Sequence, residues 1–283
     1  MGRVDLEGRT ALVTGASSGI GREIARVLAR DYRANVIIVA RREDRLRALA
    51  EELEQLHEAH VDVVVADLAQ PADVERVLAR ARELGVEAVV LNAGITHFGP
   101  HLELSHADFE RMLAVNVTSL VRLSTELGRD FVARRHGSML LVSSLAGLQA
   151  VPYQGAYAGT KAFVVGYGRS LQYELAPHGV AVTTFCPGGV RTEMNVDAGL
   201  EAAFDSDLLL MNAEVCAKDA VKAMVRRRAL RIPGVLNRVG MMVFRMLPSS
   251  FVIQQMGRQY RRALDRARAA RKSRTGGDRP TGR

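Results

Sequence analysis

Short, unbroken runs of apolar and mainly β-branched residues alternate with longer helical stretches over the first 190 residues of this chain. Examples are residues 35–40, 61–66 and 180–185. A strand without polar alternation is buried on both faces, which is typical of a parallel sheet covered by helices on each side. Because crossovers between parallel strands are right-handed, the pattern predicts a doubly wound α/β fold.

The strands and helices of this fold can be placed along the sequence. Seven strands are predicted near residues 11–13, 35–40, 61–66, 87–91, 138–143, 180–185 and 229–232. Helices are predicted over residues 19–33, 43–59, 71–84, 105–135, 155–177 and 213–228. Residues 1–232 are thus predicted to form one sheet-based domain. Residues 233–283 are predicted to form a helical basic extension, with disorder expected over residues 257–283.

The first strand runs into a glycine-rich turn, Thr14-Gly-Ala-Ser-Ser-Gly-Ile-Gly21. Glycines let the backbone approach a pyrophosphate closely, and the N-terminus of the following helix favours an anion. The residues predicted to hold a dinucleotide here are Gly15, Ser17, Ser18, Gly19, Ile20 and Gly21. The alternative is a tight turn without a ligand. The position between the first strand and the first helix favours the dinucleotide site.

The residues after the second strand indicate which dinucleotide is bound. A site that reads a free ribose 2′-hydroxyl carries Asp or Glu at this position, whereas here Ala40 is followed by Arg41 and Arg42. Guanidinium groups match the charge and the geometry of a 2′-phosphate. The two arginines therefore favour NADP(H) over NAD(H). Alternatively, they only begin a solvated helix.

Two further segments follow strands at the sheet edge where ligands bind in such folds. Asp67 and Leu68 follow the third strand, and Asn92, Ala93 and Gly94 follow the fourth. Asp67 is a candidate acceptor for an adenine amino group. Asn92 is a candidate tie between neighbouring strands beside the cofactor.

Ser144, Tyr157 and Lys161 carry the strongest chemical signal. Tyr157 and Lys161 are four residues apart, so a helix places them on one face. Tyrosine is a weak acid at neutral pH because its ordinary pKa is about 10, and a neighbouring ammonium group lowers that pKa by stabilising the phenolate. Ser144 follows the fifth strand and can hold a substrate oxygen.

Taken in order, these motifs resemble the short-chain dehydrogenase/reductase family over roughly residues 8–230. The matching segments are Thr14–Gly21, Asp67, Asn92–Gly94, Asn116, Ser143–Ser144, Tyr157–Lys161 and Pro187–Thr192. Leu91 departs from the family pattern, because many members have another Asn at that position. The resemblance implies a Rossmann-type fold, a nicotinamide cofactor and oxidoreductase activity.

The resemblance also implies roles for individual residues. Tyr157 would be the general acid–base, Ser144 would orient the substrate carbonyl, and Lys161 would lower the pKa of the tyrosine and hold the nicotinamide ribose. Asn116 would position a water in the proton relay. The thirteen-residue spacing to Tyr157 favours Ser144 over its neighbour Ser143. The residues expected to flank the nicotinamide are Pro187, Gly188, Val190 and Thr192.

Charge is divided unevenly along the chain. The net charge is +8, with −7 over residues 1–219 and +15 over residues 220–283. The basic, partly apolar C-terminus predicts contact with an anionic membrane surface, and a lid over the active site or a subunit interface is an equally weighted alternative. With two cysteines, no apolar signal region and no long apolar run, the sequence favours a cytoplasmic protein. Neither a metal site nor nucleic-acid binding is expected.

These observations predict an NADP(H)-dependent oxidoreductase that transfers a hydride between nicotinamide and a carbonyl or secondary alcohol. The substrate is expected to be lipophilic, because the predicted pocket residues are the apolar Leu145, Leu148, Val151, Phe204, Leu208 and Leu209. The alternatives are an NAD-linked alcohol dehydrogenase and a catalytically idle dinucleotide-binding regulator or scaffold. The resemblance implies a homodimer or homotetramer formed through the helices near residues 105–135 and 155–177.

Overall fold

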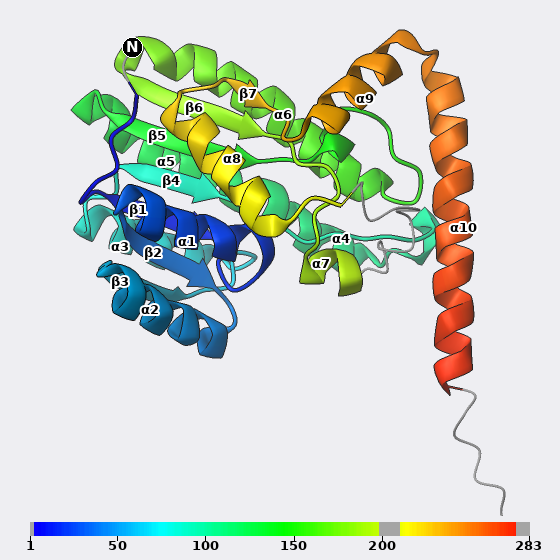
Figure 1. Ribbon diagram of the computed structural model, residues 1–283, viewed down its shortest axis with the longest axis horizontal. Coiled ribbons are helices and arrows are strands. Elements are labelled where there is room, and N and C mark those ends of the chain that lie inside the picture. The colour runs from blue at the N-terminus through cyan, green and yellow to red at the C-terminus, as the bar shows by residue number, and fades with distance from the viewer. Residues whose placement is uncertain (1–2, 198–209, 276–283) are drawn as a thin grey trace, which may run out of the picture.

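The computed structural model describes residues 3–197 and 210–275. In these residues seven parallel strands form one sheet in the order β3-β2-β1-β4-β5-β6-β7 (Figure 1). The strands are β1 (Thr10–Thr14), β2 (Asn35–Ala40), β3 (Val61–Val65), β4 (Ala88–Leu91), β5 (Gly137–Val142), β6 (Val180–Phe185) and β7 (Leu230–Arg231). The predicted doubly wound fold is confirmed. The strand order reverses between β1 and β4, which opens a crevice for ligands at the carboxyl ends of these strands.

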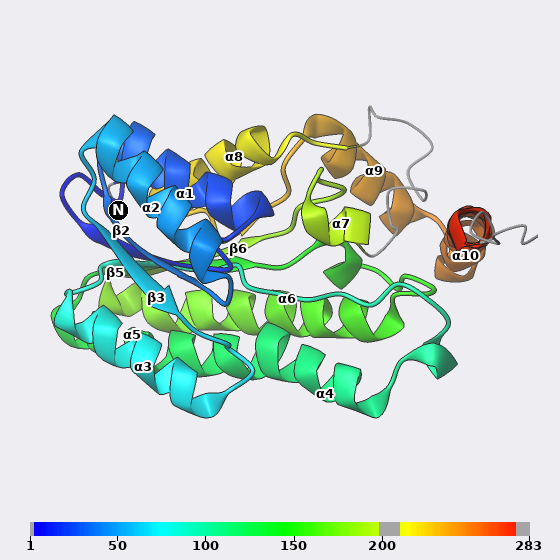
Figure 2. The ribbon, with the colours of Figure 1, turned by 90° about the horizontal axis from the view of Figure 1, so that it is seen from below.

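Helices cover both faces of the sheet (Figure 2). One layer consists of α1 (Gly19–Tyr32), α2 (Glu43–His57) and α8 (Ala213–Val225). The other consists of α3 (Pro71–Glu83), α4 (His106–Leu113), α5 (Ser119–Arg134) and α6 (Gly155–Leu175). Neighbouring residues of β2 belong to opposite hydrophobic cores, Ile38 to the first and Ile37 to the second. Burial on both sides explains why the strand sequences show no polar alternation.

One wide helical turn separates α4 from α5. Residues Ala114–Thr118 form a single π-helical turn with Asn116 at its centre. The predicted helix over residues 105–135 is present from His106 to Arg134, with this π-helical turn inside it. A π turn inserts one extra residue and re-aims the side chains around it, and such turns are frequent at functional sites.

After β7 the chain leaves the sheet and forms α9 (Val235–Met246) and α10 (Ser249–Thr275), which stand beyond the carboxyl ends of the strands (Figure 1). The short helix α7 (Glu193–Asp197) lies at the same edge. The expected disorder from residue 257 is wrong as far as Thr275, because the segment is rich in Arg and Ala, which favour helix. Residues 276–283 lie outside the described residues.

The C-terminal extension is the only part of the fold for which a membrane role was predicted. Over residues 3–197 and 210–275, every helix is too short or too polar to cross a bilayer. The proposed domain boundary at residue 232 stays a prediction, and the sheet itself ends at Arg231.

Candidate active site

A cavity of about 630 Å³ opens at the carboxyl edge of the sheet, within the size range of small-molecule and cofactor sites. The predicted site residues that line it are Gly15, Ser17, Ser18, Gly19, Ile20, Arg41, Arg42, Asp67, Leu68, Asn92, Ala93, Gly94, Ser144, Tyr157, Lys161, Pro187, Gly188, Val190 and Thr192. Gly21 and Asn116 do not line it. The fold therefore gathers residues from seven separate segments of the chain around one hollow.

The glycine-rich turn is shaped by backbone angles that favour glycine. Gly15 and Gly19 have φ values of +70° and +56°. A Cβ on Gly21 would lie 2.3 Å from the carbonyl oxygen of Gly15, so Gly21 lets α1 pack against the turn and serves packing rather than the cavity. Asn92 Nδ2 donates to the carbonyl oxygen of Thr14 at 3.0 Å. The predicted tie between β1 and the segment after β4 is thus confirmed.

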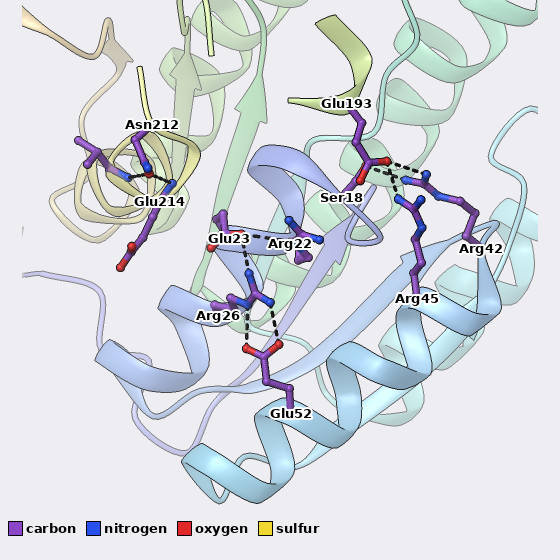
Figure 3. Close-up of polar contacts among 11 residues, drawn as sticks. Ser18, Arg22, Glu23, Arg26, Arg42, Arg45, Glu52, Glu193, Asn212 and Glu214 are labelled. Atoms are coloured by element: carbon purple, nitrogen blue, oxygen red, sulfur yellow. Dashed lines mark hydrogen bonds and ion pairs between the residues drawn. The ribbon is translucent and has the colours of Figure 1, made fainter. Parts of the chain in front are cut away.

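Arginines from the end of β2 and the start of α2 hold an anionic group beside this turn (Figure 3). Arg42 donates to the hydroxyls of Ser17 at 3.2 Å and Ser18 at 2.7 Å. Arg42 Nη1 also donates to Glu193 Oε2 at 2.9 Å, and Arg45 donates to the same oxygen at 2.5 Å. The hydrogen bond from Arg45 lowers the pKa of Glu193 despite some burial, so this carboxylate is ionised at neutral pH.

Arg41 and Asp67 line the same part of the cavity. Arg41 is exposed, whereas Asp67 accepts hydrogen bonds from Arg111 Nη2 at 2.7 Å and from the Ala69 N–H at 3.1 Å. Burial raises the pKa of Asp67, but these hydrogen bonds and the charges of Arg111 and Arg41 outweigh it and hold the pKa below its usual value. Asp67 is therefore an ionised acceptor, and its role toward adenine stays a prediction.

The two adjacent serines are used differently. Ser143 is buried, and its hydroxyl donates to the carbonyl oxygen of Lys161 at 2.7 Å. Ser144 accepts a hydrogen bond from the Ala146 N–H at 3.1 Å and also hydrogen-bonds Tyr157. Ser143 therefore fastens the end of β5 to α6, which leaves Ser144 as the serine directed at Tyr157.

Tyr157 and Lys161 lie one turn apart on α6, with Lys161 Nζ 5.8 Å from the centre of the Tyr157 ring. Burial raises the pKa of Tyr157 to about 12, and the hydrogen bond from Ser144 opposes this rise only in part. Burial also lowers the pKa of Lys161 to about 8, and its Nζ donates to the carbonyl oxygen of Val142 at 3.0 Å. Burial is the largest influence on the pKa of Tyr157, and the expected lowering of that pKa by Lys161 stays a prediction. Tyr157 is accordingly protonated at neutral pH.

Asn116 supports the site from behind the cavity wall. Its Oδ1 accepts from the Ile95 N–H at 2.8 Å, and its Nδ2 donates to the Ile95 carbonyl at 2.9 Å and to Thr160 Oγ1 at 3.0 Å. A Cβ on Gly94 would lie 3.4 Å from Asn116 Oδ1 and 3.3 Å from Lys161 Nζ. Asn116 is thus fixed beside Lys161, and its role in a proton relay stays a prediction.

The segment after β6 closes another side of the cavity. A Cβ on Gly188 would lie 2.8 Å from Asn237 Nδ2, so α9 packs directly on this turn. A Cβ on Gly19 would lie 3.1 Å from Thr192 Cγ2, so the segment reaches across to the glycine-rich turn. Val190 pairs with Met211 in an isolated parallel bridge. These contacts hold residues 187–192, which are expected to flank the nicotinamide, against α9 and against the glycine-rich turn.

Several cavity residues were missed by the sequence analysis. Gln149, Glu193, Met256 and Tyr260 all line the cavity. Met256 and Tyr260 are four residues apart, a spacing that places them on one helix face, but nothing in the sequence indicates that this face meets the active site. Gln149 and Glu193 carry no recognisable signal.

The six apolar residues predicted for the substrate pocket have different outcomes. Leu145 and Val151 line the cavity, whereas Leu148 does not. Phe204, Leu208 and Leu209 lie outside the described residues.

Comparison with known proteins decides the family. A family model described as short chain dehydrogenase matches residues 9–202. This chain belongs to the short-chain dehydrogenase family. Nodulation protein G of Rhizobium sp. (strain N33) is 38% identical over 192 residues, which are 67% of this chain and 76% of that protein.

Two solved structures resemble nearly the whole chain. A short-chain dehydrogenase from Sphingobium yanoikuyae in complex with NADPH has 28% identity and a TM-score of 0.76, covering 97% of this chain and 98% of that one. The bulky-bulky ketone specific alcohol dehydrogenase from Comamonas testosteroni has 25% identity and a TM-score of 0.73, covering 99% and 98%. As a short-chain dehydrogenase, this chain is an oxidoreductase that uses a nicotinamide dinucleotide for hydride transfer.

Proposed function

We propose that this short-chain dehydrogenase is NADP(H)-dependent and interconverts a carbonyl and a secondary alcohol on a lipophilic small molecule. The observation that carries the proposal is the meeting of Ser144, Tyr157 and Lys161 with the glycine-rich turn and Arg42 in one cavity. Proton-transfer groups and a dinucleotide cradle in the same hollow favour an active enzyme over an idle dinucleotide-binding scaffold.

Arg41 and Arg42 support NADP(H) over the NAD-linked alternative. Arg42 already holds a carboxylate beside Ser17 and Ser18, and the same guanidinium donors suit a 2′-phosphate. The pyrophosphate would lie against the glycine-rich turn at the start of α1, where the backbone N–H groups favour an anion. The similar protein from Sphingobium yanoikuyae was solved with NADPH.

The proposed chemistry assigns one task to each polar side chain. The bound nicotinamide supplies or accepts the hydride. Tyr157, protonated at neutral pH, donates a proton to the carbonyl oxygen during reduction and takes it back during oxidation. Ser144 donates a hydrogen bond to the same oxygen. Lys161, still mainly charged at pH 7, stabilises the phenolate that proton donation leaves behind.

An apolar wall beside Tyr157 supports a lipophilic substrate. Leu145, Val151, Met194 and Met256 line the cavity together with the proton-transfer residues. Apolar lining with a few polar groups is typical of sites that bind apolar small molecules. The related enzyme from Comamonas testosteroni is specific for bulky-bulky ketones, which supports a substrate with two sizeable groups on the carbonyl carbon.

We also propose a cytoplasmic homodimer or homotetramer that contacts anionic membranes peripherally. The predicted subunit contacts lie on α4, α5 and α6, and the exposed aromatic side chains of Phe163 and Tyr173 on α6 support this location. Membrane contact is supported by α9 and α10, because residues 233–275 carry ten basic residues and one acidic residue.

The function is tested by assaying the purified protein with NADPH and with NADH against ketones of increasing size. We expect Tyr157→Phe to lower kcat about 10²–10⁴-fold while the Kd for NADPH stays near the wild-type value. Tyr173→Phe, an exposed tyrosine on the same helix, is the matched control and should leave kcat unchanged. Near-wild-type turnover by Tyr157→Phe would contradict the mechanism, and equal affinity of the wild type for both cofactors would contradict the NADP(H) preference.

A further inference from the structure

The helix α10 lies across the loop that follows β5 and carries Ser144. Gln149 Nε2 in this loop contacts Met256 Sδ at 3.2 Å, and Arg261 donates to the hydroxyl of Tyr153 at 3.0 Å. A Cβ on Gly257 would be in ordinary contact with the ring of Pro152, at 3.5 Å. The first half of α10 is therefore seated on the active-site loop.

The same helix also reaches the loop that follows β4. The rings of Phe98 and Tyr260 pack edge to face, with centroids 5.6 Å apart and an interplanar angle of 74°. Arg268 donates to Glu103 at 2.6 Å. Because this ion pair is largely exposed, it contributes little, and the apolar and aromatic contacts hold α10 in place.

Two side chains of α10 enter the cavity. Met256 and Tyr260 are one helical turn apart, and both line the hollow that contains Tyr157. Burial raises the pKa of Tyr260, and the charge of an ionised Tyr260 would raise the pKa of Tyr157 further. The two tyrosines therefore face the same space, and Tyr260 is a neutral hydroxyl at physiological pH.

A polar group beside Met256 is left without a partner. Gln149 Oε1 is buried and makes no hydrogen bond within the described part of the chain, while its Nε2 contacts Met256. Gln149 also lines the cavity. A buried polar atom without a protein partner is costly, so this acceptor at the cavity wall is suited to a hydrogen-bond donor that enters the cavity. The acceptor Gln149 Oε1 calls for a hydroxyl or an amine on a ligand.

Building on the proposed oxidoreductase function, we propose that α10 forms the far wall of the substrate site, where Met256 packs on a bulky apolar body and Tyr260 and Gln149 bind a hydroxyl remote from the reacting carbon. The substrate class is therefore a large apolar ketone or secondary alcohol that carries a second hydroxyl. A site that binds a substrate hydroxyl with buried polar groups discriminates against analogues without it, because those groups are then left unpaired.

The test uses the full chain saturated with NADPH and pairs of bicyclic or polycyclic ketones that differ by one hydroxyl remote from the carbonyl. In the wild type, the hydroxylated member of a pair should have a KM at least tenfold lower. Tyr260→Phe and Gln149→Leu should each remove most of this preference with little change in kcat. Met256→Ala should raise KM for both members of every pair.

The matched control is Gln255→Ala, an exposed position on the same helix, which should change neither KM nor the preference. Binding of the same ketones to Tyr157→Phe loaded with NADPH is measured by calorimetry, so the preference can be read without turnover. Unchanged preference in Tyr260→Phe and Gln149→Leu, or binding of no ketone at all, would overturn the role of α10. Failure to bind NADPH would instead overturn the proposed function.

Discussion

At the scale of single residues, Arg42 connects cofactor choice with the segment that follows β6. The carboxylate of Glu193 accepts hydrogen bonds from Arg45 and from Arg42, and the guanidinium group of Arg42 is proposed to bind a 2′-phosphate (Figure 3). Both partners are partly exposed, so this ion pair is worth only about 0–1 kcal/mol. The carboxylate nevertheless competes with any other anion for the same guanidinium groups. We therefore expect Glu193 to weaken the binding of a 2′-phosphate without affecting a free 2′-hydroxyl.

We expect Glu193→Gln to tighten NADPH binding about two- to fivefold and to leave NADH binding unchanged, because only NADPH carries the competing charge. Arg42→Ala should weaken NADPH binding about tenfold or more. Glu43→Gln is the matched control, since Glu43 pairs with Arg47 on the exposed side of α2. Both Kd values are measured by titration of cofactor fluorescence. An equal change in the Kd of NADH and NADPH would argue against competition for the phosphate site.

Sequence reasoning located the residues of the site better than it described their energetics. The spacing of Ser144, Tyr157 and Lys161 sufficed to bring them together, because strand ends and helix faces follow from local pattern. It could not give the pKa of Tyr157, since burial is the largest influence on that pKa and depends on the whole fold. Glu193 was missed because its partners are about 150 residues away in the chain.

At the scale of secondary-structure elements, the π turn between α4 and α5 determines where Asn116 points. The apolar pattern of this region continues through the turn, so the sequence predicts one unbroken helix. The observed turn places Asn116 inside the protein, where its amide joins the Ile95 backbone to Thr160 on α6. The side chain thus connects the loop after β4 to the helix that carries Tyr157.

We expect Asn116→Ala to lower the free energy of unfolding by about 1–3 kcal/mol, because the N–H and C=O groups of Ile95 lose their partners. Urea denaturation with an unchanged m-value measures this loss. Thr118→Ala, an exposed position in the same π turn, is the control and should change stability by less than about 0.5 kcal/mol. A loss no larger than that of the control would mean that the amide does not hold the turn.

The difference between local sequence pattern and contacts between distant parts of the chain also explains which elements could be predicted. Strands β2, β3 and β6 match their predicted positions closely, because an unbroken apolar run between turns has few other solutions in a parallel sheet. Residues 257–275 are rich in Arg and Ala, which favour helix, but the place of that helix in the fold depends on contacts that no local pattern encodes. Their charge suggested disorder, but Met256 and Tyr260 anchor α10 on the active-site loops.

At the scale of the whole molecule, the C-terminal extension has two different sides. One side of α9 packs on the turn at Gly188 through Asn237, and Met241 is buried. The opposite side leaves apolar side chains more than half exposed, namely Val235, Leu236, Val239, Met242 and Met246. These residues recur at helical spacing, so they form one stripe. With the arginines of α10 nearby, the stripe has the composition of a helix that lies on an anionic membrane.

Membrane contact is therefore predicted to depend on this stripe and on charge. The full chain should float with vesicles containing anionic phospholipid at low salt, and high salt should release it because the basic residues are then screened.

The apolar stripe is tested by a triple variant that changes Leu236, Met242 and Met246 to Gln. This variant should bind the vesicles more than tenfold more weakly, since burying even one such side chain is worth about 1.5–3 kcal/mol. The matched control changes three exposed side chains elsewhere, Leu56, Leu102 and Val215, to Gln and should float like the wild type. Two results would contradict membrane contact: a full chain that stays unbound at low salt, or a stripe variant that dissociates an oligomer in size-exclusion chromatography. The second result would identify the stripe as a subunit interface.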